Sequence, residues 1–232
     1  AQLAEDRSFE RLEMYDPAPE PTPDALERDA REAESAALQV DGITQVSSAS
    51  AAYGSQDVYL AASNGFSGGY QRSSRSTSCV AIAGTGTGME RDYDADQRIF
   101  QSDLRSAQDI GRTAAERTLE RMNPRKPKTG AYPVLFDERI SSSLIGHLLM
   151  AINGVAIARK SSWALDLLGK EVLPGHLSLT EDPHRVRVAG SRPFDAEGLP
   201  TQKRDIVKDW VLTGWTLDLA TARKLGLQPT GN

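Results

Sequence analysis

Two proline clusters constrain this chain more than any other feature of its sequence. The segment YDPAPEPTP, Tyr15 to Pro23, holds four prolines in nine residues, and PRKPKTG follows at residues 124–130. Proline fixes φ and lacks a backbone N–H, so neither segment can lie inside a helix or a central strand. We therefore interpret the first as an extended connector and the second as a domain boundary. This predicts two domains, residues 1–128 and residues 129–232.

Local signals predict two helices in the first domain, one towards each end. Thr22 is suited to cap a helix and Pro23 to occupy its first position, which predicts a helix from Pro23 to about Leu38. Apolar residues at helical spacing predict a second helix over residues 102–122, which Asn123 and Pro124 end.

Between these helices the sequence is rich in Ser, Gly, Thr and Ala. Short apolar or β-branched segments bounded by NGFSGG and GTGTGM predict an antiparallel meander of four or five strands between Ile43 and Tyr93. In the second half, AYPVLFDER at 131–139 predicts a strand and residues 142–152 a helix. The fold class is therefore α+β: an antiparallel meander sheet with helices in the N-terminal part, and a mixed, strand-rich C-terminal part.

The rest of that C-terminal part is expected to be built from short elements. Residues 163–184 predict a short helix, a turn and a strand. Residues 201–226 predict two strands joined by a tight turn, followed by a short helix.

Composition excludes some classes of function. There are 27 Lys and Arg against 32 Asp and Glu, a net charge of −5, and the basic runs PRKPK and ARK contain no aromatic residues. Direct DNA binding is therefore not favoured. We find no signal peptide and no apolar run of the roughly 18 residues that a membrane helix needs. The single cysteine, Cys79, lies in a predicted strand and is expected to be a buried small hydrophobe in a reducing compartment. These features favour a cytoplasmic protein with no membrane segment.

His147 is the one ionisable group between Leu144 and Ala158, the apolar part of the stretch SSSLIGHLLMAINGVAIARKSS at residues 141–162. A zinc site needs about four ligands, and a helical site places several of them on one face. The positions three to five residues from His147 carry only Ser142, Ser143, Leu144, Met150, Ala151 and Ile152. We therefore interpret His147 as a hydrogen-bonded histidine on a helix face.

Other sets of catalytic or metal-binding residues are possible alternatives but are not favoured. His176 and His184 lie in predicted loops, and a metal site that combines all three histidines remains an alternative. EDPH, residues 181–184, is interpreted as a turn. No GxSxG motif is present, although the members of a Ser–His–Asp site can be distant in sequence. The run GTGTGM lacks the spacing of a dinucleotide-binding loop and is interpreted as a hairpin turn.

Three stretches together resemble one protein family. They are MERDYDAD at 89–96, the stretch 141–162 with the LLGKEVLP that follows it, and PFDAEGLPTQKRDIVKDWVLTGWTLDLATARKLGLQPTGN at 193–232. They are similar to segments of the TldD/TldE (PmbA) family, also called modulator of DNA gyrase. The resemblance covers most of the chain from about residue 40. It implies a longer protein, since family members continue beyond the T-G-N segment and Ala1 is not a natural start.

The family has two branches, which differ at the central helix. The TldD branch carries H-E-x-x-x-H there and binds zinc, whereas the TldE branch lacks the motif and is understood as the partner subunit of a two-subunit metalloprotease. Alignment on the RK pair at 159–160 places the two ligand positions at Ile145 and Met150 and the glutamate position at Gly146. His147 is out of register with both ligands. The chain thus resembles the TldE branch.

This resemblance implies a non-catalytic subunit. No cofactor is expected in this chain; zinc would belong to a TldD-type partner, and the substrate would be a peptide or an unfolded protein. Five further positions match family motifs without an assigned role, namely Arg159, Lys160, Asp195, Glu197 and Gly198. Relatives place a glycine where this chain has Trp210, which predicts a different type or register for the hairpin turn there.

Two other functions remain as alternatives. One is an interaction module that acts on DNA gyrase or on a toxin–antitoxin system without any role in proteolysis. The other is an autonomous hydrolase that uses His147, His176, Asp182 and a serine.

Overall fold

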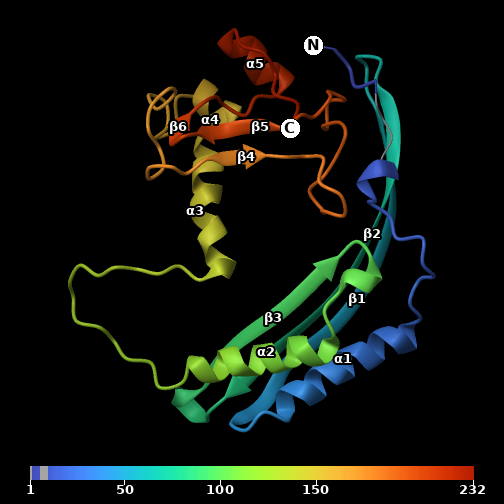
Figure 1. The fold of residues 1–232 in the computed structure, drawn as a ribbon, viewed down its shortest axis with the longest axis vertical. Coiled ribbons are helices and arrows are strands. Elements are labelled where there is room, and N and C mark those ends of the chain that lie inside the picture. The colour runs from blue at the N-terminus through green and yellow to red at the C-terminus, as the bar shows by residue number, and fades with distance from the viewer. Residues whose placement is uncertain (1, 6–9) are drawn as a thin grey trace.

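The computed structural model describes residues 2–5 and 10–232 and has an α+β architecture in two parts (Figure 1). The first part contains α1 (Pro23–Leu38), β1 (Ile43–Ala61), β2 (Ser67–Ala83), β3 (Glu90–Arg98) and α2 (Ala107–Glu120). The second part contains α3 (Glu138–Ala151), α4 (Gly154–Ala158), β4 (Leu179–Glu181), β5 (Arg204–Lys208), β6 (Val211–Leu212) and α5 (Leu219–Leu225). Single 3-10 turns lie at Glu10–Leu12, Gly86–Gly88 and Gln101–Asp103.

Both helices of the first part begin at capping residues. The Oγ1 of Thr22 accepts a hydrogen bond from the amide of Ala25 at 3.2 Å, so α1 begins at Pro23 as the sequence predicts. The second helix begins at Ala107, later than predicted, because Ser106 caps it through the amide of Asp109 at 3.1 Å.

The sheet of the first part is an antiparallel meander in the order β1-β2-β3. The prediction of a meander is confirmed, but the prediction of four or five strands is wrong, because the chain forms three longer strands. The Ser and Gly residues between the apolar segments continue to pair, and β1 matches β2 from Ile43↔Ala83 to Ala61↔Ser67. Turn residues alone therefore did not end the strands.

Helices α1 and α2 cover one face of this sheet (Figure 1). Their interface with β2 is built from fully buried side chains, most of them alanines: Ala33, Ala37, Cys79, Ala81, Ile110, Ala114 and Ala115. Cys79 is a buried core residue, as predicted, and burial raises the pKa of its thiol to about 11. The thiol is therefore inert at neutral pH.

The start of the second part differs from its prediction. Residues 131–137 form no strand, although their composition favours one, and the Leu135 side chain is 98% exposed. An apolar segment needs a neighbouring strand to form a ladder, and the described residues provide none here. Instead Asp137 caps α3 by accepting from the amide of Arg139 at 2.9 Å, so that helix begins before the predicted Ser142.

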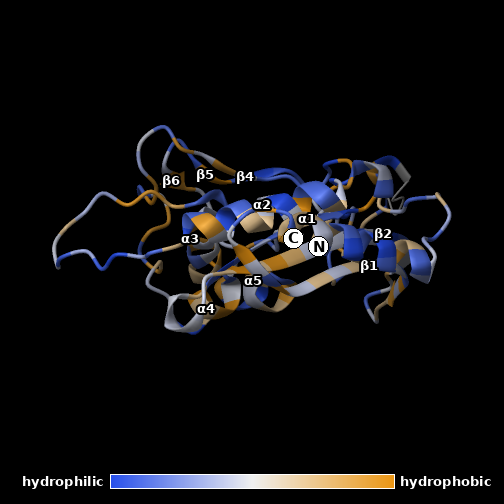
Figure 2. Ribbon diagram, turned by 90° about the horizontal axis from the view of Figure 1, so that it is seen from below, coloured by the Kyte–Doolittle hydropathy of each residue, from blue (hydrophilic) through white to orange (hydrophobic). Residues whose placement is uncertain are grey.

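The remainder of the second part packs around a core of its own. The sheet order is β4-β5-β6, and Trp215 and Leu217 are buried beside it. The short helix predicted within residues 163–184 is absent, because this segment forms turns and β4 only. No helix of the described residues is both long and apolar enough to cross a membrane. Hydrophobic residues, orange in Figure 2, nevertheless occur along the exposed α3, and the Met150 side chain is 64% exposed.

The turn between β5 and β6 is a tight two-residue turn, although the bulk of Trp210 predicts a different type or register. Asp209 and Trp210 both have positive φ, 45° and 61°, as a type I′ hairpin requires. Several contacts hold this unfavourable conformation: Trp210 donates to Leu177 at 2.9 Å, accepts from Val172 at 2.8 Å, and its ring packs edge-on against His176. The prediction of a different turn failed because such contacts between distant residues are not visible in a local pattern.

Ion pairs hold the start of α3 against β3. The Nη1 of Arg139 donates to the Oδ1 of Asp92 at 2.8 Å, and Arg139 also stacks over the ring of Tyr93. The Asp92 carboxylate is 7% exposed, and its second oxygen lies 3.4 Å from Arg121. Burial alone would raise the pKa of Asp92, but its bonds to Arg139, Tyr93 and Arg121 outweigh burial and lower that pKa.

These lowered pKa values predict that the docking of α3 is lost in acid. Asp92 and Asp137 both have lowered pKa values, Asp137 through its hydrogen bonds to Arg139. Their contribution is therefore complete above the unfolded pKa of about 3.9 and is lost as pH falls through the folded values below it. Hydrogen exchange of the first turn of α3 is expected to be unchanged from pH 7 to about 5 and to accelerate below about pH 4, after correction for the intrinsic exchange rate.

The matched variant for this prediction is Asp92→Asn, which removes the titrating group but keeps its shape. It should flatten the pH dependence of exchange in α3. An equal acid transition in Asp92→Asn and in the unaltered chain would contradict the role of this ion pair.

Candidate functional site

The central helix α3 offers no ligand for zinc at the predicted positions. Ile145 is half-buried, Met150 is exposed, and a Cβ built on Gly146 would meet nothing within 4 Å. None of the three can supply the nitrogen, oxygen or thiolate donors that zinc takes in proteins. The residues at these three positions of α3 therefore do not fit a zinc ion.

The three histidines are used in different ways. His147 is exposed and has no hydrogen bond to a described residue, so its predicted bond on the helix face is absent; Ser143, one turn away, donates to Ile140 instead at 2.6 Å. The ring of His184 lies 3.1 Å from the hydroxyl of Thr201, and its amide donates to Asp182 in a turn, as expected for EDPH. Within residues 2–5 and 10–232, no group of three or more His, Cys, Asp or Glu side chains is arranged to hold a metal ion.

The structure gives Asp195 a clear local role. Its carboxylate is 6% exposed, and one oxygen accepts from the amides of Glu197 at 2.8 Å and Leu199 at 2.9 Å. The backbone closes the same turn, since Leu199 accepts from the Asp195 amide and Asp195 accepts from the amide of Gly198. This carboxylate therefore organises a tight turn.

Glu197 and Gly198 connect that turn to other elements. The Oε2 of Glu197 accepts from the amide of Leu219 at 2.8 Å at the start of α5, and its carbonyl accepts from the side chain of Asn64 in the β1–β2 turn. Gly198 has φ +77°, and a Cβ there would lie 2.3 Å from the ring of Phe66. Glu197 and Gly198 thus join the second part of the fold to the turn between β1 and β2.

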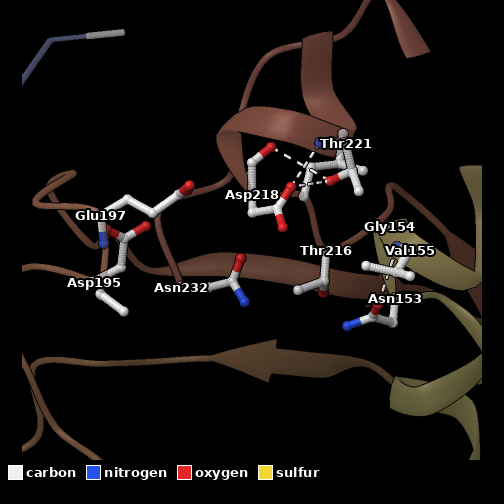
Figure 3. Close-up of a pocket in the computed structure, with 11 residues that line it drawn as sticks. Asn153, Gly154, Val155, Asp195, Glu197, Thr216, Asp218, Thr221 and Asn232 are labelled. Atoms are coloured by element: carbon white, nitrogen blue, oxygen red, sulfur yellow. Dashed lines mark hydrogen bonds between the residues drawn. The ribbon is translucent and has the colours of Figure 1, made fainter. Parts of the chain in front are cut away.

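A polar cavity of about 170 Å³ opens beside these motif residues (Figure 3). Asp195 and Glu197 line one end, the Asn153–Val155 segment at the start of α4 lines the other, and Asp218 and Asn232 lie between them. The carboxylate of Asp218 accepts from the amide and the hydroxyl of Thr221, both at 2.6 Å, and these bonds lower its pKa.

All three carboxylates of this cavity are engaged by backbone amides. These hydrogen bonds hold each of the three side chains in a fixed position in the fold. The cavity therefore has a structural role. Hydrogen bonds to the family-motif residues that line it hold segments of the second part of the fold together. Sequence reasoning identified these residues but not this role.

Arg159 and Lys160, the remaining motif positions, lie outside the cavity. Both are exposed, and neither forms an ion pair with a described residue. Arg159 ends α4 and Lys160 follows it in the left-handed region at φ 57°. They mark a chain reversal on the surface, and the structure does not bring them to Asp195 or Glu197.

Comparison with known proteins agrees with this architecture. Residues 16–122 match the model of the PmbA/TldA metallopeptidase central domain, and residues 129–232 match that of the PmbA/TldA metallopeptidase C-terminal domain. The fold is therefore that of a metallopeptidase-type protein, built from two consecutive domains of one family. The chain belongs to the PmbA/TldD metalloprotease family.

Individual relatives support the same assignment. The metalloprotease PmbA of Escherichia coli O157:H7 is 41% identical over 224 residues, which are 95% of this chain and 49% of that protein. A PmbA homologue from Haemophilus influenzae is 37% identical over the same shares. The chain thus spans about half the length of the curated relatives that it matches.

Solved structures show the same fold. A Bacteroides thetaiotaomicron structure whose name refers to modulation of DNA gyrase superimposes with a TM-score of 0.88 at 31% identity, over 94% of this chain and 50% of that one. TldE from Thermococcus kodakarensis superimposes with a TM-score of 0.74 at 17% identity, over all of this chain and 51% of that one. The second likeness supports the fold alone.

Proposed function

We propose that this chain is part of a non-catalytic, TldE-type subunit of a two-subunit zinc metalloprotease that acts on peptides or unfolded proteins. The zinc and the catalytic glutamate would belong to a TldD-type partner. The observation that carries the proposal is the set of side chains on α3, where isoleucine, glycine and methionine occupy the positions that a zinc helix uses for its ligands and its glutamate. Hydrolysis by zinc requires ligands and an activated water, which this helix cannot supply.

The outer edge of β1 supports a peptide substrate. This strand is 19 residues long, lies at the edge of its sheet, contains a single charged residue, Asp57, and has its register shifts between residues 43 and 48 only. Edge strands are usually protected by lysines, prolines or bulges, because their unpaired backbone groups attract other chains. An extended peptide could add to β1 through backbone hydrogen bonds with little demand on its sequence. This sheet would then form one wall of a substrate chamber shared with the partner.

We place the protein in the cytoplasm and expect no direct contact with DNA. A net charge of −5 disfavours a nucleic-acid partner, and a single buried thiol suits a reducing compartment.

Peptide cleavage with and without a partner tests this function. The purified chain alone is expected to leave an unstructured peptide intact. Addition of a TldD-type subunit should produce cleavage that a chelator abolishes and zinc restores. The matched control is a partner whose zinc-binding histidines are replaced by alanine, which should be inactive in the same mixture.

Three results would contradict the proposal. The first is chelator-sensitive cleavage by the chain alone. The second is cleavage that disappears in the folded His147→Ala variant, which would favour an autonomous hydrolase. The third is a pull-down that recovers a topoisomerase and no TldD-type protein, which would favour a role in modulation of gyrase.

A further inference from the structure

The turn that follows α4 carries side chains that the fold itself does not use. Arg159 and Lys160 are exposed, and neither forms an ion pair within the part of the chain that the structure describes. Trp163, three residues further on, is 66% exposed, whereas Trp215 is buried in the core of the second part. Arginine and tryptophan are among the residue types most enriched where protein surfaces bind one another. Arg159 and Lys160 are also the two family-motif positions that the cavity beside α5 leaves without a role.

The backbone of this turn is fixed, so its side chains project from a rigid base. The amide of Ser161 donates to the carbonyl of Ala156 at 3.0 Å, which is the outer hydrogen bond of a Schellman motif. The hydroxyl of Ser162 donates to the carbonyl of Ala151 at 2.6 Å and ties the turn to the end of α3. A surface that is already ordered loses little conformational entropy when a partner binds it.

Lys160 occupies the position that a Schellman motif usually gives to glycine. Its φ is 57°, in the left-handed region, which glycine adopts freely and a residue with a Cβ does not. Helix α5 ends in the same conformation with a glycine, Gly226, at φ 69°. Unfavourable backbone conformations are concentrated at functional positions. The lysine is therefore explained by a use for its side chain and not by the needs of the turn.

Two apolar side chains extend the surface around the turn. Met150 is 64% exposed, and the hydrogen bond between the turn and α3 joins the residues next to Met150 and Trp163, so these two positions are neighbours in the fold. Val155 is 40% exposed and lies one helical turn before Arg159, on the same face of α4. The turn surface is defined here as Met150, Val155, Arg159, Lys160 and Trp163.

The charge of the turn surface indicates what it binds. Arg159 and Lys160 carry two positive charges, residues 140–165 contain no Asp or Glu, and the next acid along the chain is Asp166. A symmetric contact between two copies sets the same surface against itself, so it would bring these like charges together. The turn surface therefore fits an acidic surface of a different protein better than it fits a second copy of this chain.

We propose that the turn surface docks the zinc-bearing partner subunit, through an apolar pocket that accepts Trp163 and carboxylates that pair with Arg159 and Lys160. The identity of the partner rests on the proposed function, to which this adds the surface that holds it. Trp163 would be the anchor, because an indole buried at the centre of an interface contributes much of the affinity. The two cations would set the orientation and speed association.

Calorimetric titration of the purified chain with a TldD-type subunit tests the proposal. Trp163→Ala should weaken binding by about 30-fold or more, as loss of an interface anchor does. Arg159→Gln should weaken it less and should reduce the fall of affinity with increasing salt. The matched control is Leu38→Ala, which truncates an apolar side chain that is 47% exposed at the end of α1 and should bind normally.

Lys160→Gly separates a role in binding from a role in folding. Glycine suits the left-handed backbone at position 160, so this variant should unfold at the same temperature as the unaltered chain or at a higher one. It should nevertheless bind the partner about 2- to 5-fold more weakly, the usual loss for one surface ion pair. Lys126→Gly removes a charge from the exposed linker instead and should leave the affinity unchanged.

The outcomes for the turn surface differ from those for the proposed function. Unchanged affinity in folded Trp163→Ala, with zinc-dependent peptide cleavage intact, would overturn the docking role of the turn surface and leave the proposed function standing. Absence of binding by the unaltered chain would overturn both. A dimer of the chain alone that Trp163→Ala converts to a monomer would contradict the proposal, because a second copy would then occupy the surface.

Discussion

Gly198→Ala is expected to lower the free energy of unfolding by about 3 kcal/mol or more. Two effects combine at this position. The backbone has φ +77°, which is unfavourable for any residue with a Cβ, and that Cβ would lie 2.3 Å from Cγ and 2.6 Å from Cδ2 of Phe66. Phe66 is 1% exposed and packs edge-on against Phe194 at 4.7 Å between ring centroids, so its ring has no free space to enter.

A matched variant separates the clash from the backbone strain. Gly226 has nearly the same φ, +69°, but a Cβ there would meet nothing within 4 Å. Gly226→Ala should therefore cost only about 1 kcal/mol. Chemical denaturation of both variants measures the difference. Equal losses in the two variants would show that Phe66 does not press against residue 198.

Gly111→Ala is expected to have a comparably large effect at the interface of α1 and α2. A Cβ at position 111 would lie 2.0 Å from the carbonyl oxygen of Ala33, and backbone atoms cannot move aside as a flexible side chain can. The two helices would have to separate over the buried layer of alanines around Ile110. We expect a loss of about 3 kcal/mol or more, as for other cases of overpacking in a core.

The control for this prediction is a glycine whose replacement by alanine should stabilise the protein. Gly146 also lies inside a helix, but a Cβ there would meet nothing within 4 Å. Gly146→Ala should stabilise α3 by about 0.5 to 1 kcal/mol, since alanine is the better helix former. Thermal unfolding of both variants checks the pair. A stable Gly111→Ala protein would contradict the close contact between α1 and α2.

Local signals were sufficient for the helices of the first part. The cap at Thr22 and the proline at position 23 are short-range features, and the helix begins where they place it. The length of strands depends on a partner strand, which no local pattern reveals. The segments around QDVYLAAS and TSCVAIAG therefore became parts of two long strands, and AYPVLFDER remained without a partner.

The candidate site was predictable in its residues but not in its role. The motif at Asp195, Glu197 and Gly198 was visible in the sequence, yet its contacts with Asn64, Phe66 and Leu219 join positions far apart in the chain. The turn at Trp210 shows the same limitation, because Leu177 and Val172 hold it in place.

The central claim is that this polypeptide cannot build the family's zinc site on α3, because Ile145, Gly146 and Met150 supply no donors at the two ligand positions and the glutamate position. Its most direct test is the metal content of the purified chain after exposure to zinc and removal of the excess, measured by elemental analysis. The account predicts far less than one tightly bound zinc per chain, and the same low value for the His147→Ala variant. One zinc per chain in the unaltered protein, lost on His147→Ala, would contradict it.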